Sequence, residues 1–305
     1  MNRQVSITAI ERRSHEANNT GDIRVAANDV PSRLLLSQQS ILSIKIVCRL
    51  IKMVQRHRAA SIAVINGDDS FLPLTETLNE QIVSLFQVMQ ILAHDHGLLS
   101  VEQTNYAQTN WQAIAADWQQ DSVISNYEFH CHLIDILIQL TRHTLKFRVL
   151  PKESLPGSFN TEVELALFDV LKHIELMGKL RGLATHAASS KHCDNDTQTR
   201  VSFLIKQVDT EYQRLYPALK SLSGPLADIP TLNGLSNLKG KIERLLEIIQ
   251  RRIIDAPKIR TNGSRIYTLA TEAIDLYWEV IERALQVVEN QMLDQHLAFD
   301  RSHQK

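Results

Sequence analysis

Apolar residues recur every three to four positions along nearly the whole chain after residue 33, which is the period of an amphipathic helix. Alternating runs of β-branched residues bounded by tight turns, the signal for strands, are missing from the sequence. Glycine and proline are scarce and interrupt the helical pattern in only a few places. The pattern predicts eight helices, over the ranges 34–66, 70–95, 103–120, 123–149, 161–189, 195–222, 235–255 and 264–296.

A loop with two prolines and a glycine at 150–160 separates four predicted helices from four more. Short connections between long helices favour antiparallel neighbours. We therefore expect an all-α protein of two antiparallel four-helix bundles joined by a Pro/Gly-containing loop. The expected parts are a flexible N-terminal arm, a first bundle, a second bundle and a tail, over residues 1–33, 34–150, 151–296 and 297–305.

Two arginines lie on apolar helical stripes. Arg58 shares a face with Val47, Ile51, Val54, Ile62 and Ile65. Arg181 continues a stripe formed by Val163, Leu167, Val170, Ile174 and Met177. A guanidinium keeps its charge, and its burial without a partner is strongly unfavourable. Each arginine should therefore meet an anion, which is either a carboxylate of the chain or a ligand; Glu175 is a candidate partner for Arg181. Charge alone favours internal pairing or an arginine that reaches the bundle edge.

The overall charge excludes several classes of partner. The chain carries 33 Lys and Arg against 34 Asp and Glu, so no global field attracts nucleic acid or an anionic membrane. Three widely spaced cysteines without a CxxC pair are typical of a reducing cytoplasm. No segment approaches the ~18 apolar residues of a membrane-spanning helix, and the first 30 residues lack the apolar core of a secretory signal.

Metal and catalytic motifs are weak. The segments 130–132 and 94–96 each place two histidines two residues apart, and such residues point away from each other on a helix. No nucleophile elbow, phosphate-binding loop or dinucleotide fingerprint occurs. We therefore expect neither a metal site nor an enzyme. The tryptophans fall at positions that suit packing between helices: Trp111, Trp118 and Trp278.

The surroundings of Arg58 resemble the first motif of the NIT domain, the nitrate- and nitrite-sensing domain of bacterial signalling proteins. The stretch 50–61 follows its pattern LVxxLQxERGxS, with matches at Gln55, Arg58 and Ser61. His57 stands where the family has Glu, and Ala59 stands where it has Gly.

The surroundings of Arg181 resemble the second motif of the same family, KExxGxERA. The matches are Glu175, Gly178 and Arg181, whereas Ile174 and Leu180 depart from the usual Lys and Glu. Residues like those of the family also occur at Asn126, Tyr127, 133–137, Tyr277 and Trp278. The resemblance covers roughly residues 35–296.

The resemblance implies two helical bundles that hold nitrate or nitrite between them through Arg58 and Arg181, without any other cofactor or metal. The family also uses an arginine from a later helix of the second bundle, and Arg244 matches that place. Arg252 is its rival, because it lies nearer the apolar face of the predicted helix 235–255.

The resemblance also implies a role in signalling. In this family the sensor usually precedes an output module, but no basic RNA-binding tail follows residue 296 here. The chain resembles the sensor half of the nitrate-responsive antiterminator proteins without their ANTAR domain. We expect a soluble, cytoplasmic sensor that signals to a separate RNA-binding protein or kinase in the regulation of nitrate assimilation or respiration. It should itself contact neither nucleic acid nor membrane, and its long helices are compatible with a homodimer.

The alternative interpretation is a helical protein-interaction scaffold without a small ligand. In that case both stripe arginines would form internal salt bridges or hold a partner's carboxylate. The pairing of Arg58 and Arg181 in the folded protein distinguishes the two interpretations.

Overall fold

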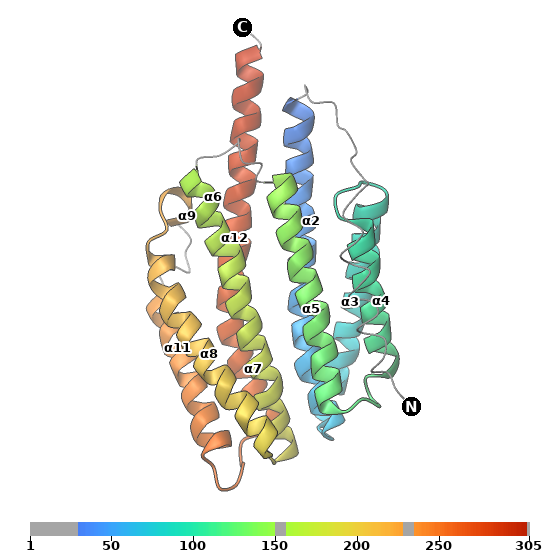
Figure 1. Ribbon diagram of the computed structural model, residues 1–305, viewed down its shortest axis with the longest axis vertical. Helices are drawn as coiled ribbons and strands as arrows, with labels where there is room; N and C mark the ends of the chain where they lie inside the picture. The colour runs from blue at the N-terminus through green and yellow to red at the C-terminus, as the bar shows by residue number, and fades with distance from the viewer. Residues whose placement is uncertain (1–29, 150–156, 228–234, 304–305) are drawn as a thin grey trace.

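A computed structural model describes residues 30–149, 157–227 and 235–303, and every regular element in those ranges is helical (Figure 1). The first part holds α2 (Val30–Ile65), α3 (Leu72–His94), α4 (Val101–Asp117) and α5 (Val123–Thr144). The second part holds α6 (Gly157–Glu164), α7 (Val170–Ser190), α8 (Asn195–Lys220), α9 (Gly224–Ala227), α11 (Leu235–Ile249) and α12 (Gly263–His303). One 3-10 turn and three π-helical segments complete it: η1 (Asp69–Phe71), η2 (Leu145–Val149), η3 (Leu165–Asp169) and η4 (Gln250–Ile254).

The all-α prediction is therefore confirmed, and each of the eight predicted ranges is helical. Two ends differ from the prediction. Helix α2 already begins at Val30, inside the predicted arm, where Pro31 suits a first helical turn. Helix α12 runs on to His303, through most of the predicted tail, because no glycine or proline interrupts it there. Residues 1–29 and most of the predicted joining loop lie outside the described residues.

Local signals explain where several helices begin and end. The side chains of Ser100, Ser122 and Asp194 each accept a hydrogen bond from a backbone N–H of the first turn that follows. Gly67 and Gly97, which lie within two residues of the ends of the predicted helical ranges 34–66 and 70–95, adopt positive φ angles of 82° and 59°. Only glycine takes this conformation without strain, so these positions separate α2 from α3 and α3 from α4.

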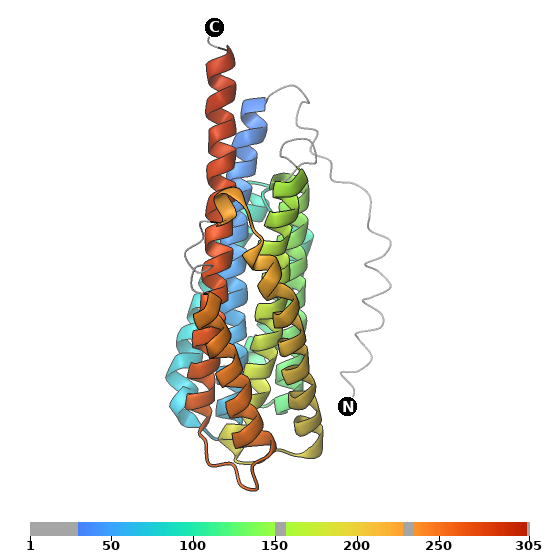
Figure 2. The same cartoon turned by 90° about the vertical axis from the view of Figure 1, so that its left-hand side faces the viewer.

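Helix α2 occupies the middle of the molecule and packs against α3, α5, α7 and α12. Figures 1 and 2 show α2 and α12 side by side along the long axis, with α3 and α4 at one edge and α8 and α11 at the other. The most extensive contact joins α7 to α12. As a result, α2, α7 and α12 meet along one seam, and both stripe arginines lie on helices of this seam. None of the described helices is both long enough and apolar enough to span a membrane.

Candidate functional site

Arg58 is completely buried on α2 and forms an internal ion pair with Glu175 of α7. Its Nη1 donates to Glu175 Oε1 at 2.7 Å, and its Nη2 donates to Oε2 at 3.3 Å. Gln55 Nε2 donates to the same carboxylate at 2.7 Å, and Cys131 Sγ lies 3.0 Å from Arg58 Nη1. The charge of Arg58 is thus satisfied within the chain, which agrees with the internal-pair interpretation for this residue.

Glu175 was expected as a partner of Arg181, and the structure assigns it to Arg58 instead. Arg181 follows Glu175 by six residues on one helix, which places their side chains about 120° apart around the helix axis. Burial alone lowers the pKa of Arg58, but the neighbouring Cys131 and Glu175 more than reverse this effect, so the net pKa is raised. The arginine therefore stays charged and the pair acts as a fixed link between α2 and α7.

Gly178 lets the Arg58 guanidinium approach the backbone of α7. A Cβ atom at this position would lie 2.8 Å from Arg58 Nη2 and 3.4 Å from Gln55 Nε2. Gly182, one turn later, has more room, because its Cβ would meet Tyr127 no closer than 3.5 Å. This contact explains why the second motif has a glycine at residue 178, because any side chain there would displace the ion pair between Arg58 and Glu175.

We expect Gly178→Ala to reduce the free energy of unfolding by about 1–3 kcal/mol, because the added methyl group forces Arg58 from its position. Gly182→Ala is the matched control and should be neutral or stabilising by up to ~1 kcal/mol, because alanine favours a helix. Urea unfolding of both variants measures the difference. Equal effects at the two positions would contradict this account of Gly178.

Arg181 is 1% exposed on α7 and, unlike Arg58, has no carboxylate partner among the described residues. Its Nη1 donates to Thr271 Oγ1 of α12 at 2.8 Å. Its Cζ lies 5.2 Å from the ring centroid of Tyr267, also on α12. Its Nε and Nη2 are buried and have no hydrogen-bond partner in the part of the chain that the structure describes. Nε and Nη2 form one edge of the guanidinium, and the two donors of this edge match the spacing of two oxygens of one anion.

The electrostatic surroundings leave Arg181 short of negative charge. Burial lowers the pKa of Arg181 from its usual 12.5 to about 10; Tyr267 and Asp275 oppose this shift, while the positive charges of Arg58 and Arg56 add to it. At neutral pH the guanidinium is still charged, because the pKa remains well above 7. Arg181 is therefore a buried cation with no carboxylate bonded to it among the described residues, an environment that an incoming anion would relieve.

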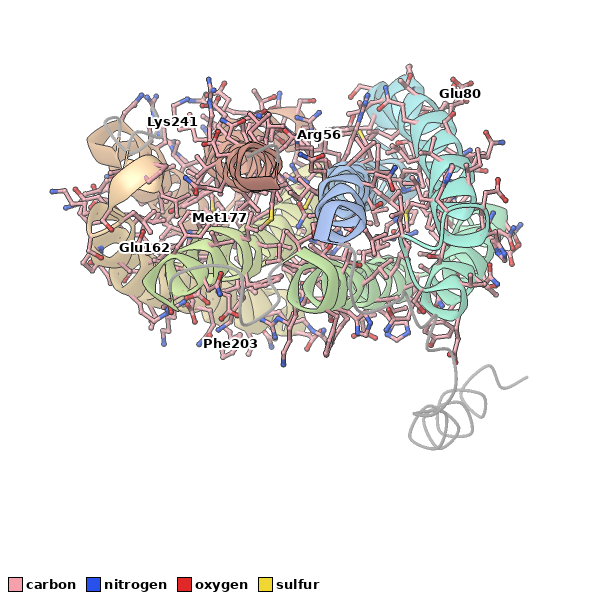
Figure 3. The ribbon with its side chains drawn as sticks, turned by 90° about the horizontal axis from the view of Figure 1, so that it is seen from above. Arg56, Glu80, Glu162, Met177, Phe203 and Lys241 are labelled. Atoms are coloured by element: carbon pink, nitrogen blue, oxygen red, sulfur yellow. The ribbon has the colours of Figure 1, made fainter. Side chains whose placement is uncertain are left out.

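Helix α12 forms one side of this site with residues that are spaced about one helical turn apart. Tyr267, Thr271 and Asp275 follow each other at intervals of four residues, so they share a face. Asp275 accepts a bond from Arg56 Nη2 of α2 at 2.8 Å and lies 3.2 Å from Lys52 Nζ. Figure 3 shows Arg56 at the junction of α2 and α12. Arg56 thus lies one turn along α12 from Arg181, although the sequence argument did not single it out.

The two candidates for a third arginine lie elsewhere. Arg244 on α11 and Arg252 on η4 are both exposed. Helix α11 packs mainly against α12, and η4 contacts α7 and α8 rather than α2. No described hydrogen bond or ion pair joins either residue to Arg58 or Arg181. The structure therefore brings Arg58 and Arg181 to the same seam and leaves Arg244 and Arg252 on the surface.

His57, which replaces the glutamate of the first motif, forms a buried pair with His130. His130 Nδ1 lies 2.7 Å from the carbonyl oxygen of Asn126, which can only accept, so Nδ1 carries the hydrogen. His130 Nε2 therefore accepts from His57 Nδ1 at 2.9 Å. His130 and its neighbour His132 point in different directions, because His132 bonds to Tyr106 instead. Burial lowers the pKa of His130 to about 3, so the pair is neutral at physiological pH.

His173 on α7 is a third buried, neutral histidine, and it makes acid sensitivity testable. Burial lowers its pKa from 6.5 to about 4, with Glu211 opposing and Arg214 adding to the shift. Above pH 6.5 the group is neutral in both the folded and unfolded states. As the pH falls below 6.5, the unfolded state takes up the proton first, so stability is lost down to the folded pKa.

Between about pH 7 and pH 5, we expect the free energy of unfolding of the wild type to fall by about 2 kcal/mol more than that of His173→Phe. Each pH unit below 6.5 adds ~1.4 kcal/mol to this loss, and phenylalanine cannot take up a proton. Phenylalanine keeps a ring beside Tyr277, whose centroid lies 4.7 Å from that of His173. Denaturant unfolding at both pH values is the measurement, with the exposed His96→Asn as control. A variant with the wild-type pH slope would refute the assignment.

Comparison with known proteins yields no relative for this chain: no family model, no curated protein and no solved structure matches it. The resemblance to the NIT domain thus rests on the motif residues and their order. Of those residues, the structure joins Gln55, Arg58 and Glu175 in one hydrogen-bonded cluster around Gly178.

Proposed function

We propose that the protein is a receptor for a small planar oxyanion, nitrate or nitrite, and that Arg181 is the residue that binds it. The observation that carries the proposal is the free Nε and Nη2 edge of a guanidinium that is 1% exposed. A buried cation without an anion is rare in folded proteins, because its desolvation is not repaid. The free edge matches two coplanar oxygens of nitrate or nitrite.

Three further groups around Arg181 support an anion at this place. Thr271 accepts a hydrogen bond from Arg181 and can donate its own hydroxyl hydrogen to a ligand. Arg56 reaches the same face of α12 and is held there by Asp275. Arg58 adds positive potential but keeps its own carboxylate. In this proposal Arg181 holds the anion, Arg56 and Thr271 complete the site, and Arg58 fixes α2 against α7.

The expected affinity follows from the number of donors. Each hydrogen bond between an ionised donor and an anion contributes about 1.5–3 kcal/mol. Two to three such bonds give roughly 3–9 kcal/mol, which corresponds to dissociation constants from several millimolar to somewhat below ~1 µM. The preference between nitrate and nitrite depends on whether a third oxygen finds a donor.

Signalling would use the seam between two four-helix bundles, with α2 in the first bundle and α7 and α12 in the second. Arg181 belongs to α7, its hydroxyl and aromatic neighbours belong to α12, and Arg56 belongs to α2. An anion that draws Arg56 from Asp275 toward Arg181 would shift α2 along α12, and rigid helices transmit such shifts. A separate output protein that reads the shift would then regulate nitrate assimilation or respiration.

The scaffold interpretation has one observation in its favour, the Arg58–Glu175 pair. A protein that only needed helix packing would have paired or replaced Arg181 as well, because apolar residues there are at least as stable. In this proposal the two arginines have different roles: Arg58 holds α2 against α7, and Arg181 binds the ligand.

Isothermal titration of nitrate into the protein tests the proposal. The wild type should bind one nitrate per chain, and Arg181→Met should bind none while remaining folded. Arg244→Met is the matched control, because it removes an exposed arginine of α11 and should leave nitrate binding unchanged. Sodium chloride at equal ionic strength controls for nonspecific anion effects. Wild-type affinity in Arg181→Met would overturn the assignment of Arg181.

A further inference from the structure

A surface cavity lies at the end of the seam where α3 and α12 begin. Its volume is about 240 Å³. The lining residues are Ser70, Phe71, Leu74, Ser264, Tyr267 and Thr268. They come from η1 and α3 on one side and from the first turns of α12 on the other. Four of the six carry hydroxyl groups and none is charged. The Ser70 hydroxyl donates to Asp68, so Ser264, Tyr267 and Thr268 are the neutral donors that the lining offers to a passing anion.

Tyr267 separates this cavity from Arg181. One contact of its ring is Phe71, which also lines the cavity, with ring centroids 5.3 Å apart in an edge-to-face arrangement. Another is the Arg181 guanidinium, whose Cζ lies 5.2 Å from the ring centroid. Tyr267 is only partly buried, whereas Arg181 is almost completely buried. The Tyr267 side chain therefore contacts the Arg181 guanidinium and also lines the open cavity.

Helix α12 carries hydroxyl groups both in the cavity and beside Arg181. Thr268 lies in the cavity and Thr271, three residues later, accepts the bond from Arg181. Residues three apart on a helix lie on neighbouring positions of one face, so the two hydroxyls lie on one side of α12. Beside the lining, the carboxylate of Asp68 accepts one hydrogen bond from Ser70 and one from Ser189.

We propose that this cavity is the entrance through which a small oxyanion reaches Arg181, with Tyr267 as the side chain that must turn aside. The inference rests on the proposed function for the identity of the ligand, but not for the route. Tyr267 is suited to the task because its partly buried ring contacts the Arg181 guanidinium and borders the open cavity. The bound anion then replaces the ring as the partner of the guanidinium.

Labelling of Arg181 by 2,3-butanedione in borate, read by peptide mass spectrometry, tests the route without requiring nitrate. The double variant Ser264→Phe and Thr268→Phe fills the cavity from two exposed positions. It should slow labelling of Arg181 at least tenfold and leave labelling of the exposed Arg244 unchanged. Glu279→Phe, an exposed position of α12 outside the cavity, is the matched control and should label at the wild-type rate. If the double variant has a lower melting temperature than the wild type, the single variant Thr268→Phe takes its place in the experiment.

The outcomes separate the route from the ligand. Equal labelling of Arg181 in the wild type and the filled variants, or no labelling in the folded wild type, would overturn the entrance. A slowed variant supports it. Nitrate added to the wild type should protect Arg181 from the reagent. Labelling that depends on the cavity but is unaffected by nitrate would leave the entrance standing and overturn the proposed function.

Discussion

Arg181→Met is expected to make the protein without ligand more stable, by about 2 kcal/mol. Burial lowers the pKa of Arg181 to about 10 from 12.5, so the folded state holds this charge less favourably than the unfolded chain does. A folded pKa below the unfolded value means that this cost is fully present below pH 10 and declines only as the pH rises toward 12.5. Methionine removes the charge and fills an apolar stripe, a kind of change that is often stabilising by 1–4 kcal/mol.

Arg58→Met provides the matched control for this prediction, because it makes the same substitution at the other stripe arginine. It should destabilise the protein by about 3 kcal/mol, since it leaves Glu175, whose side chain is 6% exposed, without its strong partner. Lys179 Nζ lies 3.9 Å from Glu175 and cannot replace the bidentate contact. Urea unfolding of both variants measures whether each substitution raises or lowers the free energy of unfolding. Destabilisation of similar size at both positions would show that Arg181, too, is structural.

Glu175→Gln should reduce the free energy of unfolding by about 3–5 kcal/mol. The carboxylate neutralises Arg58 inside the protein, and removing one partner of a buried pair leaves the other charge uncompensated. Gln55 would also lose an ionised acceptor. The loss should be fully developed at neutral pH, where Arg58 is charged, and calorimetric or urea unfolding can measure it.

Two comparisons identify the cause of this loss. The double variant Arg58→Met and Glu175→Leu removes both charges and should recover most of the stability. Glu128→Gln breaks a pair with Arg200 in which the side chains are 58% and 39% exposed, and it should cost less than ~1 kcal/mol. A loss in Glu175→Gln as small as that in Glu128→Gln would contradict the account of the Arg58 pair.

Helical periodicity predicted both arginines inside the protein, because that property depends only on residues within one helix. Their exposed fractions, 0% and 1%, confirm it. Their partners depend on how different helices are aligned, which periodicity does not contain. Glu175 therefore seemed available to Arg181 on its own helix, whereas helix packing directs it to Arg58 on α2.

The neighbours of Arg181 show the same limit. Tyr267 and Thr271 belong to a helix that begins some 80 residues later in the chain, and nothing in its apolar pattern distinguishes them. Arg56 was hidden by its polar position beside Arg58, although Asp275 holds it at the seam. The histidine pair had no signal in the helical pattern, because His57 and His130 lie on different helices. The spacing of His130 and His132 excluded a shared metal but could not reveal that His130 bonds to His57.

The central claim is that Arg181 binds nitrate, and the most direct test is the unfolding free energy as a function of nitrate concentration. Nitrate that binds only the folded state should stabilise the wild type by ~2.7 kcal/mol at a hundredfold excess over its dissociation constant. Chloride at equal ionic strength should have no comparable effect, and Arg181→Met, although more stable at the outset, should not respond to nitrate. Equal responses of the wild type and Arg181→Met to nitrate, or no response in either, would contradict the claim.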